Sequence, residues 1–163
     1  MRFDLNCRGE AELLGWTTAG TDEGFLVFDR DGDGMITCGA EMFGNFTPLS
    51  WTRDGPKAAN GFAALEWFDR NEQGGNGDGW ITTTDAVWSR LGIWIDANHN
   101  GVTEPGELQT LDEAGITSIS VAAHESRRQD RFGNEFRFRG WAGMMHRGRQ
   151  VLREIFDVFL VHG

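Results

Sequence analysis

The chain has 163 residues, of which 39% are hydrophobic, so it is long and apolar enough to fold around a substantial core as one domain. Its formal net charge of −10, from 25 acidic and 15 basic residues, argues against nucleic acid as a partner and favours cations. No apolar run of about 18 residues occurs and the start of the chain has no apolar signal segment, so we expect neither a membrane span nor a cleavable signal peptide in this chain.

A calcium-binding loop of the EF-hand type has acidic or amide side chains on alternate residues ahead of a glycine. The first segment with this pattern is Asp4–Gly9. Arg8 lies there where a metal ligand should be, and its charge would displace calcium, so we predict a degenerate loop without metal. Cys7 lies in the same loop, and Cys38 lies further along the chain. Two cysteines do not define a disulfide framework, so a disulfide and two inert thiols both remain open.

The apolar run Phe25–Phe28 predicts a buried strand that leads into the first strong metal-binding pattern. Segment 29–34 has aspartates at the first, third and fifth positions of an EF-hand loop and glycine at the sixth, and the carbonyl of Met35 follows at the seventh. The twelfth position is Ala40, and the closing Glu41 comes one residue late. A solvated acidic turn is the alternative, but three aspartates so close together repel one another without a cation.

The second loop follows segment 58–68, whose apolar residues recur at helical spacing, so we expect a helix to enter this loop. Asp69 and Asn71 fit its first and third positions, but a glycine-rich insertion separates them from the rest of the pattern. Either the insertion bulges outward, which would let Asn76 take the third position, or the site is lost and the segment is a mobile turn. A capping-box-like sequence at Thr82–Asp85 predicts a helix that leaves the loop.

The third loop, from Asp96 to Glu107, fills every ligand position of an EF-hand loop. Clusters of Asn, Asp and Gly also mark ordinary turns, but a turn does not require a closing Glu with a helix start beneath it. Pro105 at the first helical position predicts a short helix after this loop, which Gly115 ends.

The three loops together account for the charge of the chain. Ten of the 25 acidic residues are predicted ligands, and the other 15 balance the 15 basic residues. We expect about three calcium ions. The predicted metal-binding residues, of which Met35, Trp80 and Val102 act through their carbonyls, are Asp29, Asp31, Asp33, Met35, Glu41, Asp69, Asn71, Asn76, Asp78, Trp80, Thr82, Asp85, Asp96, Asn98, Asn100, Val102, Glu104 and Glu107.

The C-terminal third predicts antiparallel sheet, because Ile116–Val121, Glu135–Arg139 and Ile155–Val161 alternate or run as β-prone segments. The four histidines lack zinc-ligand spacing, and no Ser or Cys is paired with a base, so we predict no catalytic residue. Trp51 or Trp141, if exposed, would leave a glycan partner open. Beyond this, no pattern in the sequence identifies a protein or glycan partner.

Five strings and the second loop, in this order, resemble the calcium-binding region of bacterial RTX-type secreted proteins, and more closely their calcium-dependent self-processing module. The strings are Phe25–Gly34, Glu41–Asn45, Asn60–Leu65, Trp94–Gly101 and Gly106–Leu111. The resemblance covers roughly residues 3–122. It implies a secreted or cell-surface bacterial protein. In that module, calcium triggers cleavage of an Asp–Pro bond just upstream, and the new aspartyl end can join to a lysine.

We therefore predict an α+β fold, with short helices around EF-hand-like calcium loops packed with an antiparallel β-sheet. Residues 1–163 would form a single calcium-binding domain, with the loops in 3–122 and a β-rich part in 123–163. We expect a non-catalytic module whose folding and stability are driven by Ca²⁺. The alternative is an autoprocessing module or a truncated remnant of one, although this chain has no Asp–Pro bond: its prolines follow Thr47, Gly55 and Glu104.

Overall fold

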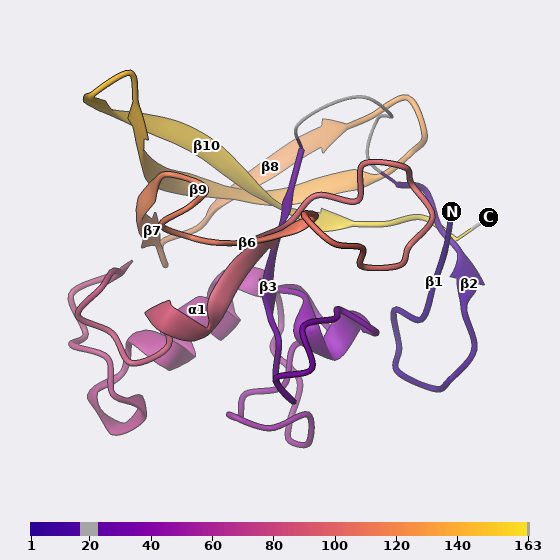
Figure 1. The fold of residues 1–163 in the computed structure, drawn as a ribbon, viewed down its shortest axis with the longest axis horizontal. Coiled ribbons are helices and arrows are strands. Elements are labelled where there is room, and N and C mark those ends of the chain that lie inside the picture. The colour runs from indigo at the N-terminus through magenta and orange to yellow at the C-terminus, as the bar shows by residue number, and fades with distance from the viewer. Residues whose placement is uncertain (17–22, 163) are drawn as a thin grey trace.

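The computed structural model describes residues 1–16 and 23–162, and these residues form a mostly β-structure with one α-helix (Figure 1). The helices are α1 (Gly61–Asp69) and the 3-10 helices η1 (Gly39–Glu41), η2 (Asn71–Gln73) and η3 (Trp88–Arg90). The strands are β1 (Arg2–Phe3), β2 (Glu12–Leu13), β3 (Phe25–Phe28), β4 (Trp80–Ile81), β5 (Leu91–Trp94), β6 (Leu108–Thr110), β7 (Ile116–Ser120), β8 (His124–Gln129), β9 (Glu135–His146) and β10 (Arg149–Phe159).

The largest sheet has the strand order β10-β9-β7-β4, and β8 also pairs with β9. Every pairing in it is antiparallel, as expected for the C-terminal third. A second sheet has the order β3-β5-β6, and β1 and β2 form a third. Figure 1 shows the large sheet on one side of the molecule, with α1 and the loops that follow β3 and α1 on the other. The strand expected at Phe25–Phe28 is β3.

The α+β prediction is wrong, because neither helix expected after a loop forms. After the third loop, Gly106 adopts φ +90°, which a right-handed helix does not allow, and β6 instead pairs with β5. After the second loop, the N–H groups of Asp85, Trp88 and Arg90 each bond to the carbonyl three residues earlier, which gives turns and η3. The described residues therefore contain no helix–loop–helix unit.

The helix expected before the second loop is α1. Asn60 caps it by accepting the Ala63 N–H at 2.8 Å. Phe62, Leu65 and Phe68 lie on its buried face, within a core that also contains residues of β3, β4, β5 and β7. No helix in the described part of the chain is long and apolar enough to cross a membrane.

The two ends of the described chain lie side by side (Figure 1). The Leu14 N–H bonds to the Met1 carbonyl at 2.8 Å, and Leu14 also forms an antiparallel bridge with His162. The N-terminal end also touches the third loop, because a Cβ added to Gly101 would be 2.4 Å from the carbonyl oxygen of Arg2.

Asp157 of β10 is a buried carboxyl, 4% exposed, whose Oδ2 has no hydrogen-bond partner among the described residues. Burial raises its pKa to about 6 from the usual 3.8, although the Gly61 N–H and the charge of Arg137 lower it. Between these two pH values the folded protein binds more protons at this group than the unfolded chain does. The free energy of unfolding therefore falls as the pH rises through this window, and the loss is complete above about pH 6.

Asp157→Asn is expected to stabilise the protein at pH 7.5 by up to about 3 kcal/mol, because it removes this buried charge. Near pH 4 the gain should be much smaller, since the carboxyl of the folded wild-type protein is already neutral. Urea unfolding at both pH values, in saturating calcium, measures the difference between variant and wild type. Asp112→Asn, at an exposed position, is the matched control. A gain that does not depend on pH would contradict this explanation.

Candidate metal centre

The three acidic loops and the N-terminal loop share one hydrogen-bond frame, in which the opening aspartate accepts the N–H of the glycine at the sixth position. The donor–acceptor distances are 2.7 Å for Gly9–Asp4, 2.8 Å for Gly34–Asp29, 2.9 Å for Gly79–Asp69 and 2.9 Å for Gly101–Asp96. Each of these glycines has a φ between +75° and +88°, a left-handed conformation that other residues rarely adopt. Loop one (29–41), loop two (69–85) and loop three (96–107) therefore fold alike around their first residue.

The closing carboxylates of the three loops also have one arrangement: each accepts the N–H of the residue at the ninth position. The distances are 2.8 Å for Thr37–Glu41, 2.7 Å for Thr82–Asp85 and 3.0 Å for Glu104–Glu107. Glu41 reaches this place although it is one residue late, because η1 takes up the extra residue. Gly39 is required there, since a Cβ would be 2.1 Å from the carbonyl oxygen of Leu5.

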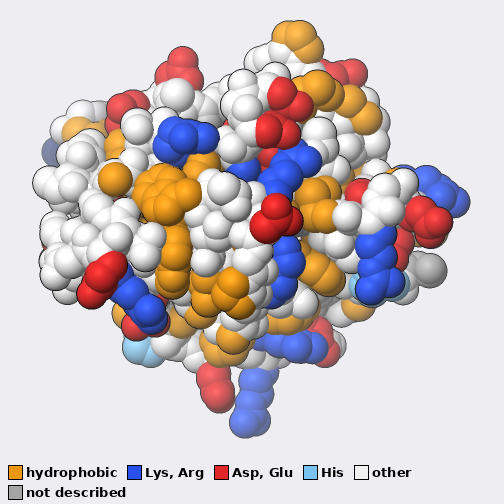
Figure 2. Space-filling model, turned by 90° about the horizontal axis from the view of Figure 1, so that it is seen from below, with side chains coloured by type: hydrophobic (Ala, Val, Ile, Leu, Met, Phe, Trp, Pro, Cys, Tyr) orange, Lys and Arg blue, Asp and Glu red, His pale blue; other side chains and the backbone are white. Residues whose placement is uncertain are grey.

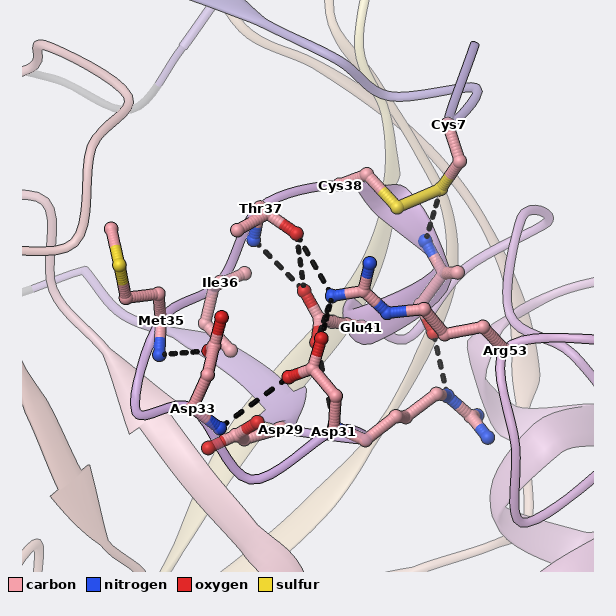
Figure 3. A network of polar contacts seen from close by, with 12 residues as sticks. Cys7, Asp29, Asp31, Asp33, Met35, Ile36, Thr37, Cys38, Glu41 and Arg53 are labelled. Atoms are coloured by element: carbon pink, nitrogen blue, oxygen red, sulfur yellow. Dashed lines mark hydrogen bonds and ion pairs between the residues drawn. A yellow bond between two sulfur atoms is a disulfide. The ribbon is translucent and has the colours of Figure 1, made fainter. Parts of the chain in front are cut away.

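Loop one brings acidic side chains together (Figure 3). One oxygen each from Asp29, Asp31 and Glu41 lies within 4.8 Å of the others, and Glu41 is completely buried. Asp33 turns one oxygen to the Met35 N–H at 2.8 Å. Of the predicted ligands of loop one, three carboxylates therefore converge on one point.

Arg53, which was not among the predicted site residues, reaches into this cluster (Figure 3). Its Nη2 lies 2.7 Å from Asp31 Oδ2 and 2.9 Å from Glu41 Oε1, and it donates to the Thr37 hydroxyl at 2.9 Å. Burial alone would lower the pKa of Arg53, but the hydrogen bond and charge of Glu41, with Asp31 and Asp33, raise it above its ordinary value. No local pattern could have predicted this contact, because Arg53 is distant from the loop in sequence.

Arg30, at the second position of loop one, is buried and fixes the segment that carries Arg53. It donates to the carbonyls of Ala40 at 2.7 Å, Thr52 at 2.9 Å and Pro48 at 3.2 Å, and its guanidinium lies 4.6 Å from the centre of the Phe28 ring. Burial lowers the pKa of Arg30 to about 10, with Glu41 acting against this shift and Arg53 adding to it. Arg30 therefore stays charged at neutral pH.

Loop two keeps its frame because the insertion bulges outward. Asn76, not Asn71, takes the third position, since its Oδ1 accepts the Asp78 N–H at 3.0 Å. Asn71 lies in η2, within the inserted turn, away from this frame. Gly75 permits the close return of the chain, because a Cβ there would be 2.1 Å from the carbonyl oxygen of Asp69.

The rest of loop two holds its predicted residues in contact with one another. Asp78 Oδ1 accepts the Trp80 N–H at 2.9 Å, and the Thr82 hydroxyl lies 3.3 Å from Asp85 Oδ2. Asp85 Oδ1 also accepts the Asn76 N–H at 3.2 Å, which ties the closing carboxylate to the third position. Thr84, a residue not predicted, accepts from the Asn76 amide at 3.1 Å.

Loop three has its amide side chains grouped around Glu104. The Asn98 and Asn100 amides both donate to the Glu104 carboxylate, at 2.5 and 3.3 Å. Asn100 Oδ1 accepts the Val102 N–H at 2.7 Å. Glu107 also accepts the Ala97 N–H at 2.9 Å, so the two ends of the loop are joined through its closing carboxylate.

Loops one and three lie against each other at their eighth positions. The Ile36 N–H donates to the Thr103 hydroxyl at 2.9 Å. Loop one is also joined to the N-terminal loop, because Cys7 and Cys38 form a disulfide. The sequence left a disulfide and two inert thiols open, and the structure shows the disulfide.

The acidic side chains do not form one continuous patch on the face that Figure 2 shows, where they are interspersed with Lys, Arg and hydrophobic side chains. The carboxylates that open or close the loops are instead mostly buried. The buried ones are Glu41, Asp69, Asp85, Asp96 and Glu107. Trp141 is 41% exposed, whereas Trp51 packs against Phe28 and Phe68.

The chain is a disulfide-linked β-domain with repeated acidic loops. It belongs to the SPM domain family, whose model matches residues 1–160. The chain is also similar to the iron-regulated protein FrpA of Neisseria meningitidis serogroup C. The two are 41% identical over 120 residues, which cover 74% of this chain and 10% of that protein. The chain thus matches only a small part of this bacterial relative.

Proposed function

We propose that this protein is a non-catalytic calcium-binding module, in which ions held by loops one, two and three drive folding. The observation that carries the proposal is the convergence of Asp29, Asp31 and Glu41, whose oxygens lie within 4.8 Å of one another. Calcium binds oxygen at about 2.3–2.6 Å, so one ion can contact oxygens up to about 5 Å apart. The three carboxylates are therefore close enough to share one ion.

The chemistry of the loops favours calcium over other metals. Their predicted side-chain donors are carboxylates, amides and a hydroxyl, which are hard oxygen ligands. Zinc and copper prefer sulfur and nitrogen, but both cysteines are in the disulfide. Magnesium usually keeps several waters, which fits poorly with closing carboxylates as buried as Glu41, at 0% exposed, and Asp85, at 3%.

Burial of the closing carboxylates also supports a metal-driven stability. An ionised carboxylate in the interior costs several kcal/mol unless it is paired or binds a metal. Asp85 and Glu107 have hydrogen bonds to backbone N–H groups but no ion pair among the described residues. Calcium at loops two and three would supply the missing positive charge.

We expect the wild-type protein to bind three calcium ions, and single ligand variants to bind two, as counted by native mass spectrometry. The variants are Asp29→Ala for loop one, Asp78→Ala for loop two and Glu107→Ala for loop three. Asp112→Ala removes an acidic group from an exposed position outside the loops and should leave the count unchanged. A count that is the same in all five proteins would refute the assignment of sites.

The disulfide supports a location outside the reducing cytoplasm, as the RTX-like resemblance implies. Disulfides persist in oxidising compartments and are rare in cytosolic proteins. Secretion or display at the bacterial surface also fits a calcium-driven module, because calcium is far more abundant outside cells. We therefore propose a secreted or cell-surface bacterial protein.

Calcium-dependent autoprocessing is the second candidate, and the position of the N-terminal end favours it. The Arg2 carbonyl would lie 2.4 Å from a Cβ on Gly101, so a segment joined before Met1 would begin beside loop three. An Asp–Pro bond in such a segment would be close to a calcium site. A fusion that carries an Asp–Pro segment before Met1 should give calcium-dependent fragments on a gel, and an uncleaved fusion at every calcium concentration would refute this candidate.

A further inference from the structure

A single nitrogen of Arg53 contacts three of the functional positions of loop one. Its Nη2 lies 2.7 Å from Asp31 Oδ2 at the third position and 2.9 Å from Thr37 Oγ1 at the ninth. The closing carboxylate, Glu41 Oε1, is also 2.9 Å away. The guanidinium therefore uses oxygens on which a calcium ion in loop one would depend.

The arginine reaches this place from a fixed segment. Arg30 holds the Thr52 carbonyl at 2.9 Å, and the neighbouring Trp51 packs edge-on against Phe68, with 5.1 Å between ring centres. Trp51 Nε1 also donates to Gln73 at 3.2 Å. The backbone beside Arg53 is thus held by contacts that do not involve the loop-one carboxylates.

The Arg53 side chain is itself only partly committed to the loop. The side chain is 39% exposed, and its Nε is buried without a hydrogen-bond partner among the described residues, so moving this group into water would allow the Nε to be hydrated. A rotation about its side-chain bonds could therefore move the charged end from the loop into solvent without a change in the backbone.

Loops two and three differ from loop one in this respect. In the described part of the chain, no Lys or Arg side chain contacts their closing carboxylates, Asp85 and Glu107. The groups that face their acidic side chains are neutral amides, such as Asn76 beside Asp78 and Asn98 beside Glu104. Among the described residues, an ion pair between an arginine and the closing carboxylate is therefore found in loop one but not in loops two and three.

We propose that Arg53 is an internal cation of loop one, which calcium must displace, so that loop one fills after loops two and three and releases the arginine when it fills. The inference rests on the calcium-binding function proposed above and specifies how one of its sites is regulated. Guanidinium and calcium cannot both lie among the same carboxylates, because their positive charges repel one another at such distances. Each calcium that binds loop one must break two ion pairs of Arg53.

The test is a calcium titration of Arg53→Gln, with each loop followed separately by the amide signal of its sixth-position glycine in ¹H–¹⁵N spectra. Gly34 reports loop one, Gly79 loop two and Gly101 loop three, because each N–H donates to the opening aspartate of its loop. In the variant, the calcium dissociation constant of loop one, as reported by Gly34, should fall by about tenfold. The dissociation constants of loops two and three, as reported by Gly79 and Gly101, should change by less than about twofold.

Arg153→Gln is the matched control, since Arg153 is exposed on β10 and its loss changes the net charge by the same amount. It should leave all three constants close to those of the wild-type protein. Arg53→Lys keeps the positive charge but lacks the forked donors of the guanidinium. The calcium dissociation constant that Gly34 reports should therefore lie between those of Arg53→Gln and the wild type. This variant also provides the measurement if Arg53→Gln does not fold.

The outcomes separate this inference from the proposed function. If Gly79 and Gly101 respond to calcium but the Gly34 constant is equal in wild type and Arg53 variants, the role of Arg53 is refuted and the calcium function stands. If Gly34 does not respond in any variant, loop one is no calcium site and the inference is also refuted. If none of the three glycines responds in any protein, both proposals fail.

Discussion

Chelation of calcium is expected to abolish the near-ultraviolet circular dichroism of the tryptophans near the loops and to unfold much of the protein at room temperature. Trp67, Trp80, Trp88 and Trp94 flank the loops in sequence, and Trp94 is completely buried. At a calcium concentration of one hundred times its dissociation constant, each site adds about 2.7 kcal/mol to the free energy of unfolding. Three such sites supply about as much free energy as the whole stability of a typical domain.

The expected loss follows from carboxylates that the fold buries. Asp69, Asp85 and Asp96 are each no more than 4% exposed, and Glu107 is 8% exposed. Without a cation, these carboxylates lie in a poorly solvated place with no compensating positive charge, which costs free energy. Because several like charges are buried, we expect the calcium-free fold to be weak.

Restoring excess calcium to the chelated protein should recover the tryptophan signal, and raising the sodium chloride concentration alone should not. Glu107→Gln should shift the calcium midpoint of this recovery upward, whereas Glu66→Gln on the exposed side of α1 should not. A chelated protein that keeps its tryptophan signal and melts at the same temperature as the calcium-bound protein would contradict the proposed function.

Loss of the Cys7–Cys38 disulfide is expected to lower the free energy of unfolding by about 3–4 kcal/mol. The bridge joins residues 31 positions apart, so its removal enlarges the conformational freedom of the unfolded chain. The disulfide also lies beside the proposed calcium site of loop one, because Cys38 is between Thr37 and Glu41 and the Ala40 N–H donates to Cys7 Sγ at 3.2 Å. Calcium should therefore bind loop one more weakly in the Cys7→Ser/Cys38→Ser protein.

Urea unfolding of the wild-type protein with and without a reductant, in saturating calcium, measures the effect of the disulfide. The double serine variant is the control, since its stability should equal that of the reduced wild type and should not respond to the reductant. Equal stabilities of the oxidised and reduced wild-type proteins would show that the bridge does not contribute to folding.

The hydrogen-bond frame of the candidate metal centre could be predicted from the sequence because it depends on local spacing. Asp96 bonds to an N–H only five residues away, and Gly101 at that place has the left-handed conformation that the pattern requires. The same holds for loop two, where the choice between Asn71 and Asn76 depended only on the direction in which a short insertion bulges. Local hydrogen bonds of this kind leave a clear signature in a single sequence.

Features that depend on distant contacts could not be predicted. The helix expected after Glu107 is replaced by β6 because this segment pairs with β5, and the sequence of the segment alone does not show that partner. Strand β9 extends to His146, well beyond the expected 135–139. The sequence pattern did not indicate this extension, because Gly140 and Gly143 interrupt the alternation typical of a strand. These glycines are needed for close approach: a Cβ on Gly140 would be 2.5 Å from the Phe62 ring, and one on Gly143 would be 2.4 Å from the Ser118 hydroxyl.

Leu14 holds both ends of the described chain, through Met1 on one side and His162 on the other. In the unfolded state, a chain of this length has ends about 100 Å apart on average. If this domain lies within a longer protein, calcium-driven folding would therefore draw the segments on its two sides together to neighbouring positions. Binding of a few ions would in this way produce a contraction of the whole chain that is much larger than the loops themselves.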